Sequence, residues 1–229
     1  MTAELGAVIV TGGASGLGAA VACGVAAHGG TPVVLDRRVP PGGFDHEVVD
    51  LADTDAAEAA VDRVLARHPD VHGIVTCAGT DVPGALDAVD RGTWERVVAV
   101  NLLSTAATIR AALPQLKRTH GRVVTVASTL GLRGAGDATA YCTSKFGVVG
   151  FTRALAAETA GEVGVTLLVP GGMSTAFFAD REERYRPPPD ARLSPPDEVA
   201  DAVLYALTRP AGVEVRELLV CPSTESSWP

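Results

Sequence analysis

The stretch A-V-I-V-T-G-G-A-S-G-L-G, residues 7–18, decides the fold of this chain. Its first five residues form an apolar run typical of a buried strand. The glycine-rich turn that follows leads into a helical pattern, with Leu17, Val21 and Val25 at four-residue spacing. Small residues in such a turn let the backbone approach a pyrophosphate, and the N-terminus of the next helix supplies N–H donors for the anion. The stretch therefore predicts a strand, a turn and a helix that bind a dinucleotide.

The next predicted strand bears on which dinucleotide is bound. Residues 32–36 are apolar except for a final acid, Asp36, which lies eighteen residues after Gly18. A carboxylate at this point can accept hydrogen bonds from both ribose hydroxyls and repels a 2′-phosphate, which favours NAD. Arg37 and Arg38 favour NADP instead, because a guanidinium can bind the 2′-phosphate. We predict NAD as the cofactor, with NADP the less favoured choice.

Strand and helix patterns alternate along the rest of the chain. Further strands are expected at residues 47–49, 72–77, 121–127, 163–169 and 215–220, and helices near Asp55, after Thr93, at Tyr141 and after Ser194. Residues 37–46 are too rich in proline and glycine for a full helix. Such alternation is typical of a parallel sheet with helices on both faces. We predict an α/β fold: a single doubly wound, Rossmann-type domain over residues 1–229, with about seven parallel strands.

Residues 175–193 differ in composition from the rest of the chain. They hold Phe177 and Phe178, a charged run over residues 180–186 and three consecutive prolines. We expect a short helix and a mobile loop here that cover the substrate as a lid. The alternative is an ordinary surface excursion. The charged run is expected to be a solvated helix face rather than a surface that docks a carrier protein.

Composition excludes several classes of protein. The 229 residues are 47% hydrophobic and carry a formal net charge of −8, which argues against a nucleic-acid surface and fits a soluble cytoplasmic protein. No signal peptide is evident, and no apolar run looks long enough to cross a membrane. The four cysteines include no C-x-x-C pair, so we expect buried free thiols in a reducing compartment. The five histidines form no metal-binding pattern.

The stretch from Ser128 to Lys145 holds the candidate chemistry. Tyr141 and Lys145 are four residues apart and share one face of a predicted helix. A phenol titrates near pH ~10, and a fixed ammonium close by lowers that pKa toward useful acid–base chemistry. Ser128 follows an apolar run, so its hydroxyl is expected at the carboxyl end of a strand, where open α/β sheets bind ligands. A Tyr-x-x-x-Lys pair alone occurs by chance on many helices, so this interpretation depends on the other motifs.

Together these motifs resemble the classical short-chain dehydrogenase/reductase family, over nearly the whole chain. The turn at residues 11–18 is similar to the family's T-G-x-x-x-G-x-G, and residues 170–175 are similar to its P-G-x-x-x-T. The family's Asn-Ser-Tyr-Lys tetrad is matched in order and approximate spacing by Asn101, Ser128, Tyr141 and Lys145. One departure is that Thr76 and Cys77 stand where the family usually has two asparagines, which puts cofactor affinity in question.

The resemblance implies a mechanism and a set of site residues. In the oxidation direction Tyr141, as phenolate, takes the hydroxyl proton while the substrate carbon passes a hydride to NAD⁺; in reduction it returns that proton. Lys145 lowers the Tyr141 pKa and bonds the nicotinamide ribose, Ser128 holds the substrate oxygen, and Asn101 holds a water that links Lys145 to solvent. No metal is required. The implied cofactor contacts are Gly12, Ser15, Gly16, Leu17, Gly18, Asp36, Arg37, Asp50 (at the adenine), Leu51, Cys77, Ala78, Gly79, Tyr141, Lys145, Pro170, Gly171, Met173 and Thr175. The expected substrate contacts are Ser128, Leu130, Tyr141, Gly172 and Phe177.

The expected function is the NAD(H)-dependent interconversion of a secondary alcohol and a ketone, since the expected pocket walls are mostly apolar. One alternative is an NADPH-dependent 3-oxoacyl thioester reductase. Another, of a different class, is a non-catalytic dinucleotide-binding sensor, against which the intact tetrad argues. The expected partners are a small alcohol or ketone and further copies of this chain in a homodimer or homotetramer, with no nucleic acid and no membrane.

Overall fold

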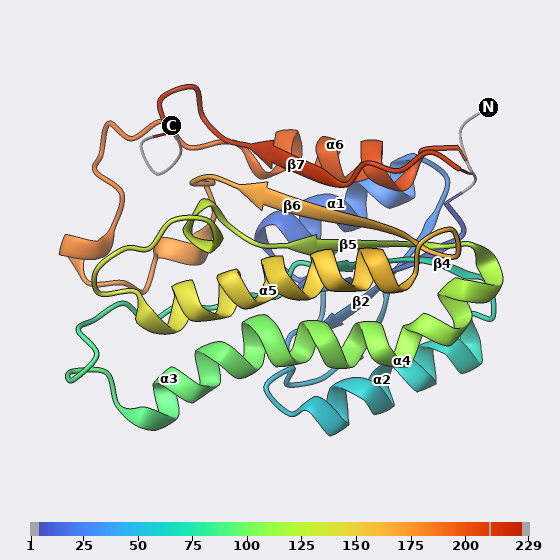
Figure 1. The fold of residues 1–229 in the computed structure, drawn as a ribbon, viewed down its shortest axis with the longest axis horizontal. Coiled ribbons are helices and arrows are strands. Elements are labelled where there is room, and N and C mark those ends of the chain that lie inside the picture. Colours follow the sequence, from blue (N-terminus) through green and yellow to red (C-terminus); the bar gives the residue numbers. More distant parts are fainter. Residues whose placement is uncertain (1–4, 211, 226–229) are drawn as a thin grey trace.

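A seven-stranded parallel sheet forms the centre of the molecule (Figure 1). The computed structural model describes residues 5–210 and 212–225, and its strand order is β3-β2-β1-β4-β5-β6-β7. The strands are β1 Ala7–Thr11, β2 Thr31–Asp36, β3 Asp45–Val48, β4 Val71–Thr76, β5 Arg122–Val126, β6 Gly164–Pro170 and β7 Glu217–Val220. Every neighbouring pair is parallel. The predicted α/β, doubly wound fold class is confirmed.

Helices cover both faces of the sheet, as the strand connections require. They are α1 Gly16–Ala27, α2 Thr54–Arg67, α3 Arg91–Val98, α4 Ser104–Thr119, α5 Thr139–Glu158 and α6 Pro196–Leu207. Short helical turns are η1 Pro41–Gly43, η2 Ala99–Leu103, η3 Thr129–Gly131, η4 Ala176–Phe178 and η5 Glu183–Tyr185. Helices α1 and α6 pack together on one face, and α2, α4 and α5 cover the other (Figure 1).

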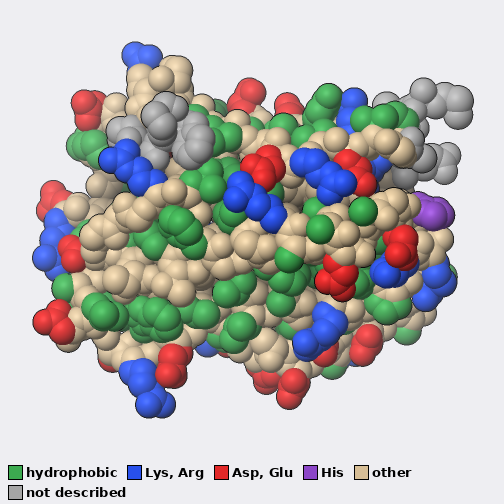
Figure 2. Space-filling model, in the orientation of Figure 1, with side chains coloured by type: hydrophobic (Ala, Val, Ile, Leu, Met, Phe, Trp, Pro, Cys, Tyr) green, Lys and Arg blue, Asp and Glu red, His purple; other side chains and the backbone are tan. Residues whose placement is uncertain are grey.

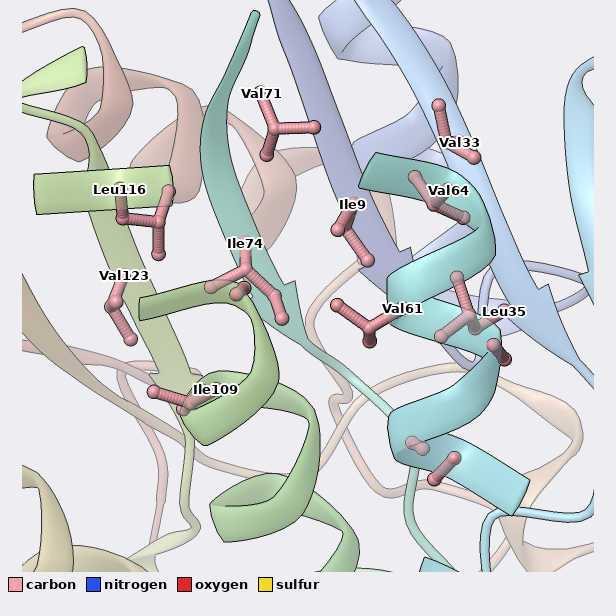
Figure 3. Close-up of a cluster of buried hydrophobic side chains, with 14 of the residues drawn as sticks. Ile9, Val33, Leu35, Val61, Val64, Val71, Ile74, Ile109, Leu116 and Val123 are labelled. Carbon is pink, nitrogen blue, oxygen red and sulfur yellow. The ribbon is translucent and has the colours of Figure 1, made fainter. Parts of the chain in front are cut away.

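The core explains why the central strands are almost continuously apolar. Side chains of successive strand residues point to opposite faces, and here both faces are covered, so both sets of side chains are buried. On one face Ile9, Ile74 and Val123 meet Val61 of α2 and Ile109 of α4 (Figure 3). On the other face the alternate strand residues pack against α1 and α6. A parallel sheet buried in this way fixes its carboxyl edge as a rigid base for a site.

The edge strand β3 is where the sequence-based strand prediction was wrong. A strand was expected at residues 47–49, but β3 is Asp45–Val48 and pairs only with β2. Its residues are mostly polar because α2 covers it with arginines: Arg63 pairs with Glu47, and Arg67 pairs with Glu47 and Asp45. Because Asp45, His46 and Glu47 form no apolar run, the start of this strand was missed. Strands β4 and β7 also differ slightly from the expected bounds, 71–76 and 217–220 in place of 72–77 and 215–220.

One long helical run lies over one face of the sheet (Figure 1). A single helix was expected after Thr93; the run begins at Arg91, capped by Asp90, whose side chain accepts a hydrogen bond from the Thr93 N–H at 3.0 Å. It continues to Thr119, but Ala99–Leu103 is a π-helical turn. By length and composition this run is apolar enough to cross a membrane, which corrects the expectation that no apolar run reaches that length. In this fold it is a core helix, whose buried face packs against α2 and the sheet.

The surface is mixed in character. On the face shown in Figure 2, acidic and basic side chains lie among apolar ones, and no continuous basic stripe of the kind that binds nucleic acid is visible there. The cysteine prediction was wrong in part: the described residues hold all four as free thiols, but Cys23 is exposed, and Cys77, Cys142 and Cys221 are partly buried.

Candidate active site

A cavity of about 1240 Å³ opens at the carboxyl edge of the sheet. It lies beyond the ends of β1, β4, β5 and β6, at the point where the strand order reverses between β1 and β4. Open α/β sheets bind ligands at such a switch point. Every residue that we expected to contact cofactor or substrate lines this cavity. Of the expected catalytic residues, Ser128, Tyr141 and Lys145 line it, whereas Asn101 lies behind its wall.

The glycine turn between β1 and α1 leaves no room for larger residues. Gly12 has a φ of +69°, and a Cβ there would lie 2.8 Å from the Cα of Ala78. A Cβ on Gly18 would overlap the carbonyl oxygen of Gly12. The first N–H groups of α1 have no acceptors within the helix and lie at this turn. A narrow backbone cradle at a helix N-terminus fits the pyrophosphate of NAD(P), so the residues present suit that cofactor.

Asp36 is held in place at the cavity edge. Its Oδ2 accepts a hydrogen bond from the Ala14 N–H and its Oδ1 accepts one from the Arg38 N–H, both at 3.0 Å. The Arg38 guanidinium donates to the Ser15 Oγ at 3.0 Å, so it reaches from the end of β2 to the glycine turn. Spacing gave no signal for this contact, because the two residues are 23 positions apart. An acid and a cation thus share the edge where a ribose would lie.

Asp50, expected at the adenine, is already paired. Arg96 of α3 donates to both of its carboxylate oxygens, at 3.1 and 2.9 Å. The Ala52 N–H and the Arg96 guanidinium hold the Asp50 pKa below its usual value. Both side chains are about half exposed, 52% for Asp50 and 47% for Arg96, so the pair is a surface ion pair that adds little stability. Arg96 also lines the cavity and was not predicted.

Ser128, Tyr141 and Lys145 come together at the ends of β5 and α5. The Ser128 Oγ accepts a hydrogen bond from the Leu130 N–H at 3.1 Å, which fixes the turn η3, and the Ser128 side chain is also hydrogen-bonded to the Tyr141 phenol. Lys145 is 4% exposed, and its Nζ donates to the Val126 carbonyl at 2.9 Å. That Nζ lies 5.7 Å from the centroid of the Tyr141 ring. One hydroxyl, one phenol and one ammonium therefore share one wall of the cavity.

The pKa of Tyr141 differs from the sequence-based prediction, which was that Lys145 lowers it. Burial raises the pKa of Tyr141 to about 12, although the Ser128 hydrogen bond and the charge of Arg181 oppose the rise. Lys145 was expected to lower this pKa, but its ammonium is directed at the Val126 carbonyl rather than at the phenol. Burial lowers the pKa of Lys145 itself to about 8. Tyr141 is therefore a neutral phenol at neutral pH.

Asn101 holds the backbone around the site. Its Nδ2 donates to the Thr80 carbonyl at 2.9 Å and to the Ser144 Oγ at 3.0 Å, and its Oδ1 accepts from the Thr80 N–H at 2.8 Å. It lies in the π-helical turn η2, and its side chain is 1% exposed. These contacts join the loop after β4 to α5. The expected role of Asn101, holding a water for Lys145, stays a prediction.

Thr76 and Cys77, where the sequence departs from the family pattern, lie at the end of β4 beside the glycine turn. The Ala78 N–H donates to the Thr11 Oγ at 3.1 Å, which joins the ends of β1 and β4. Cys77 lines the cavity, and burial raises the pKa of its thiol to about 12, so it stays neutral. The Thr76 Oγ is buried without a hydrogen-bond partner.

An ion pair near Tyr141 was not predicted from the sequence. Arg181 lies in the charged run at residues 180–186, expected to be solvated, yet its side chain is only 14% exposed. Its guanidinium donates to the Asp81 Oδ2 at 2.7 Å. The segment around it forms the two short turns η4 and η5 rather than one helix. Glu225, also not predicted, accepts a hydrogen bond from the Gly172 N–H at 3.1 Å and lines the cavity.

Among the residues that the structure describes, no three His, Cys, Asp or Glu side chains come together in a way that could hold a metal ion. The site instead combines a dinucleotide cradle with a hydroxyl, a phenol and an ammonium, and this defines a Rossmann-fold oxidoreductase that uses NAD(P).

Comparison with known proteins gives the family. The model of the short chain dehydrogenase family matches residues 6–186, and the chain belongs to that family. It is 29% identical over 216 residues to the 3-oxoacyl-[acyl-carrier-protein] reductase FabG of Thermotoga maritima, covering 86% of this chain and 88% of that protein. It is 31% identical to the glycine betaine reductase ATRR of Emericella nidulans over 95% of its own length but spans only 19% of that longer protein. An alcohol dehydrogenase from Thermococcus sibiricus, solved with 5-hydroxy-NADP, superposes with a TM-score of 0.84 at 26% identity, over 94% of this chain and 96% of that one.

Proposed function

We propose that the protein interconverts a secondary alcohol and a ketone with NAD(H), and that Tyr141 is the acid–base group. The observation that carries the proposal is the hydrogen bond between Ser128 and Tyr141 on the cavity wall, with the Lys145 ammonium on the same helix. Bound in the cradle of Gly12 and Gly18, NAD(P) would supply the hydride acceptor or donor.

Tyr141, Ser128 and Lys145 have different roles in the transfer of the proton. Because its pKa is raised to about 12, Tyr141 holds a proton on Oη at neutral pH and is ready to donate it to a carbonyl oxygen during reduction. The Ser128 hydroxyl can hold the same oxygen by a hydrogen bond. Lys145, with a pKa near 8, is largely charged at neutral pH, and its Nζ lies on the same wall, 5.7 Å from the centroid of the Tyr141 ring. At neutral pH the phenol is therefore in the protonated form that ketone reduction requires.

The walls of the substrate end suggest its chemistry. Leu130, Met173 and Phe177 line the cavity, the Phe177 ring packs against Tyr141, and the charges of Asp81 and Arg181 are paired with one another. Apolar walls around a few polar groups suit a neutral, apolar alcohol or ketone.

The choice of cofactor rests on Asp36. Its carboxylate, fixed by two backbone N–H groups, supports NAD. Two observations favour the alternative, an NADPH-dependent 3-oxoacyl thioester reductase: the Arg38 guanidinium lies at the same edge, and the relative from Thermotoga maritima carries that name. Initial rates with NADH and with NADPH separate the two: a clear preference for NADPH would overturn the NAD proposal.

The test of the function is Tyr141→Phe. We expect turnover to fall by about 10²–10⁴-fold, which is the contribution that general acid–base catalysis makes. Binding of NADH, followed by fluorescence, should stay close to that of the wild-type chain. Tyr205→Phe, on the exposed side of α6, is the matched control. Turnover near normal in Tyr141→Phe would refute the assignment, and NADH binding by the wild type with no turnover on any alcohol or ketone would favour a sensor.

A homodimer or homotetramer is supported by exposed apolar side chains on the long helices. Leu103 of η2 is 49% exposed and Phe146 of α5 is 46% exposed, although Phe146 would otherwise be expected in a core. A cytoplasmic location stays a prediction.

A further inference from the structure

We propose that the ion pair between Asp81 and Arg181 is a positioning element of this site: it joins two walls of the cavity, holds Phe177 against Tyr141 and keeps two opposite charges close to the phenol. The proposal rests on the proposed function of Tyr141 as acid–base group. Asp81 belongs to the loop after β4 and Arg181 to the segment between β6 and α6, so the pair joins two walls of the cavity.

The pair is buried, unlike the other ion pair of its segment. The Arg181 and Asp81 side chains are 14% and 5% exposed, with 2.7 Å between Nη2 and Oδ2. In the same segment, Arg184 and Glu182 are 67% and 69% exposed. A buried charge that loses its partner is strongly unfavourable, whereas a surface pair contributes little. The position of Arg181 is therefore determined by Asp81.

The Arg181 guanidinium contacts the rings of Phe177 and Phe178, and Phe177 contacts Tyr141. The Arg181 guanidinium carbon lies 4.8 Å from the centroid of the Phe177 ring and 4.7 Å from that of Phe178, and the two rings meet edge to face at 5.4 Å. The Phe177 ring in turn lies 5.8 Å from the Tyr141 ring. Cation–π contacts of this kind are directional and strengthen when they are shielded from water. Arg181 thus fixes the ring that packs on the phenol.

The charges of the pair also act on Tyr141 directly. One oxygen of Asp81 and the Nε of Arg181 are buried without hydrogen-bond partners, so each charge is only partly compensated in a place of low dielectric. Arg181 lowers the pKa of Tyr141 and Asp81 raises it. Other groups near the phenol are the Ser128 hydroxyl, which is hydrogen-bonded to it, the Cys142 thiol, whose charge when ionised would raise the pKa of Tyr141, and the Lys145 ammonium, 5.7 Å from the centroid of the Tyr141 ring.

The opposite signs of these two charges give a test. Asp81→Asn and Arg181→Met both remove the ion pair, but the first leaves a cation near Tyr141 and the second leaves a carboxyl group. If the ion pair were only a structural contact, the titration midpoint of Tyr141 would change by the same amount in both variants. A contact that sets the proton affinity of Tyr141 predicts that the phenol titrates at lower pH in Asp81→Asn than in Arg181→Met.

The readout is the titration of Tyr141 itself. The chain has three tyrosines, so replacing tyrosine with difluorotyrosine gives three fluorine NMR signals, and Tyr141→Phe identifies the one of interest. The lower intrinsic pKa of this analogue brings the titration into a range where the protein stays folded. We expect the midpoint in Asp81→Asn to lie about one pH unit or more below that in Arg181→Met, a tenfold change in proton affinity.

Controls separate this proposal from the proposed function. Arg184→Met removes the exposed arginine and should leave the Tyr141 midpoint unchanged, while Arg181→Lys should return it toward the wild-type value. Arg181→Gln replaces Arg181→Met if that variant fails to fold. Equal midpoints in the two variants, or a lower midpoint in Arg181→Met, would overturn the proposal. The titration needs no turnover, so it is independent of whether Tyr141→Phe abolishes activity.

Discussion

Replacing Lys145 with methionine should stabilise the protein in the absence of cofactor while removing its activity. Lys145 is 4% exposed, and burial lowers its pKa from 10.5 to about 8. At ~1.4 kcal/mol for each tenfold change, a charged Lys145 costs about 3 kcal/mol of folding free energy at pH 7. Methionine has a similar shape and no charge. It leaves the Val126 carbonyl without its donor, which costs about 1–2 kcal/mol, so the expected net gain is about 1–2 kcal/mol.

The pH dependence of this difference has a definite sign. Below about pH 8 both folded and unfolded wild-type chains carry the charge on Lys145, so the full cost is present. Between about pH 8 and pH 10.5 the folded chain has lost that proton and the unfolded chain has not, so wild-type stability rises relative to the variant. The advantage of Lys145→Met should therefore be largest near pH 7 and vanish or reverse near pH 10.

Urea denaturation of both chains at pH 7 and pH 9.5 measures the difference. Lys117→Met is the matched control, because Lys117 is partly exposed and pairs with Glu162 at the surface, and its change should stay within about 0.5 kcal/mol. The chain has only these two lysines, so NMR of labelled lysine titrates Lys145 directly. The reasoning is refuted if Lys145 titrates at or above its ordinary value, or if the stability difference does not change with pH.

Two further substitutions test the cradle and the core. Gly18→Ala should weaken NADH binding at least tenfold, because its Cβ would overlap the Gly12 carbonyl; Gly150→Ala, where a Cβ meets nothing within 4 Å, should bind NADH normally in the same fluorescence titration. Leu116→Ala should lower the free energy of unfolding by about 2–5 kcal/mol in urea, because Leu116 is fully buried against the sheet; a loss below 1 kcal/mol would mean that this part of the core collapses around the gap.

The fold could be predicted from the sequence wherever burial follows an apolar pattern. The first strand has the expected bounds, Ala7–Thr11, because both of its faces are covered and its residues are all apolar or small. The start of β3 could not be predicted, since its side chains are polar and pair with Arg63 and Arg67 of a helix that follows it in the chain. Ion pairs between distant residues leave no periodic signal in either segment.

The site was predictable in its residues more than in its electrostatics. Spacing placed Tyr141 and Lys145 on one helix face, and both line the cavity. The direction of the Tyr141 pKa shift depends on how deeply the phenol is buried and where the Lys145 ammonium points, and neither follows from spacing. Arg181 was missed for a related reason: a charged run indicates solvent, and only the fold shows that Asp81 lies opposite one of its members.

The hydrogen bond between Glu225 and the Gly172 N–H has a practical consequence for anyone who handles this protein. Through that contact, and through Thr224, the segment after β7 forms part of the cavity wall beside the loop that follows β6. Shortening the chain before Thr224, or fusing an affinity tag close behind Glu225, would alter the ligand pocket itself. Samples meant for binding or kinetic work are therefore best tagged at the other end of the chain, with residues 222–225 left intact.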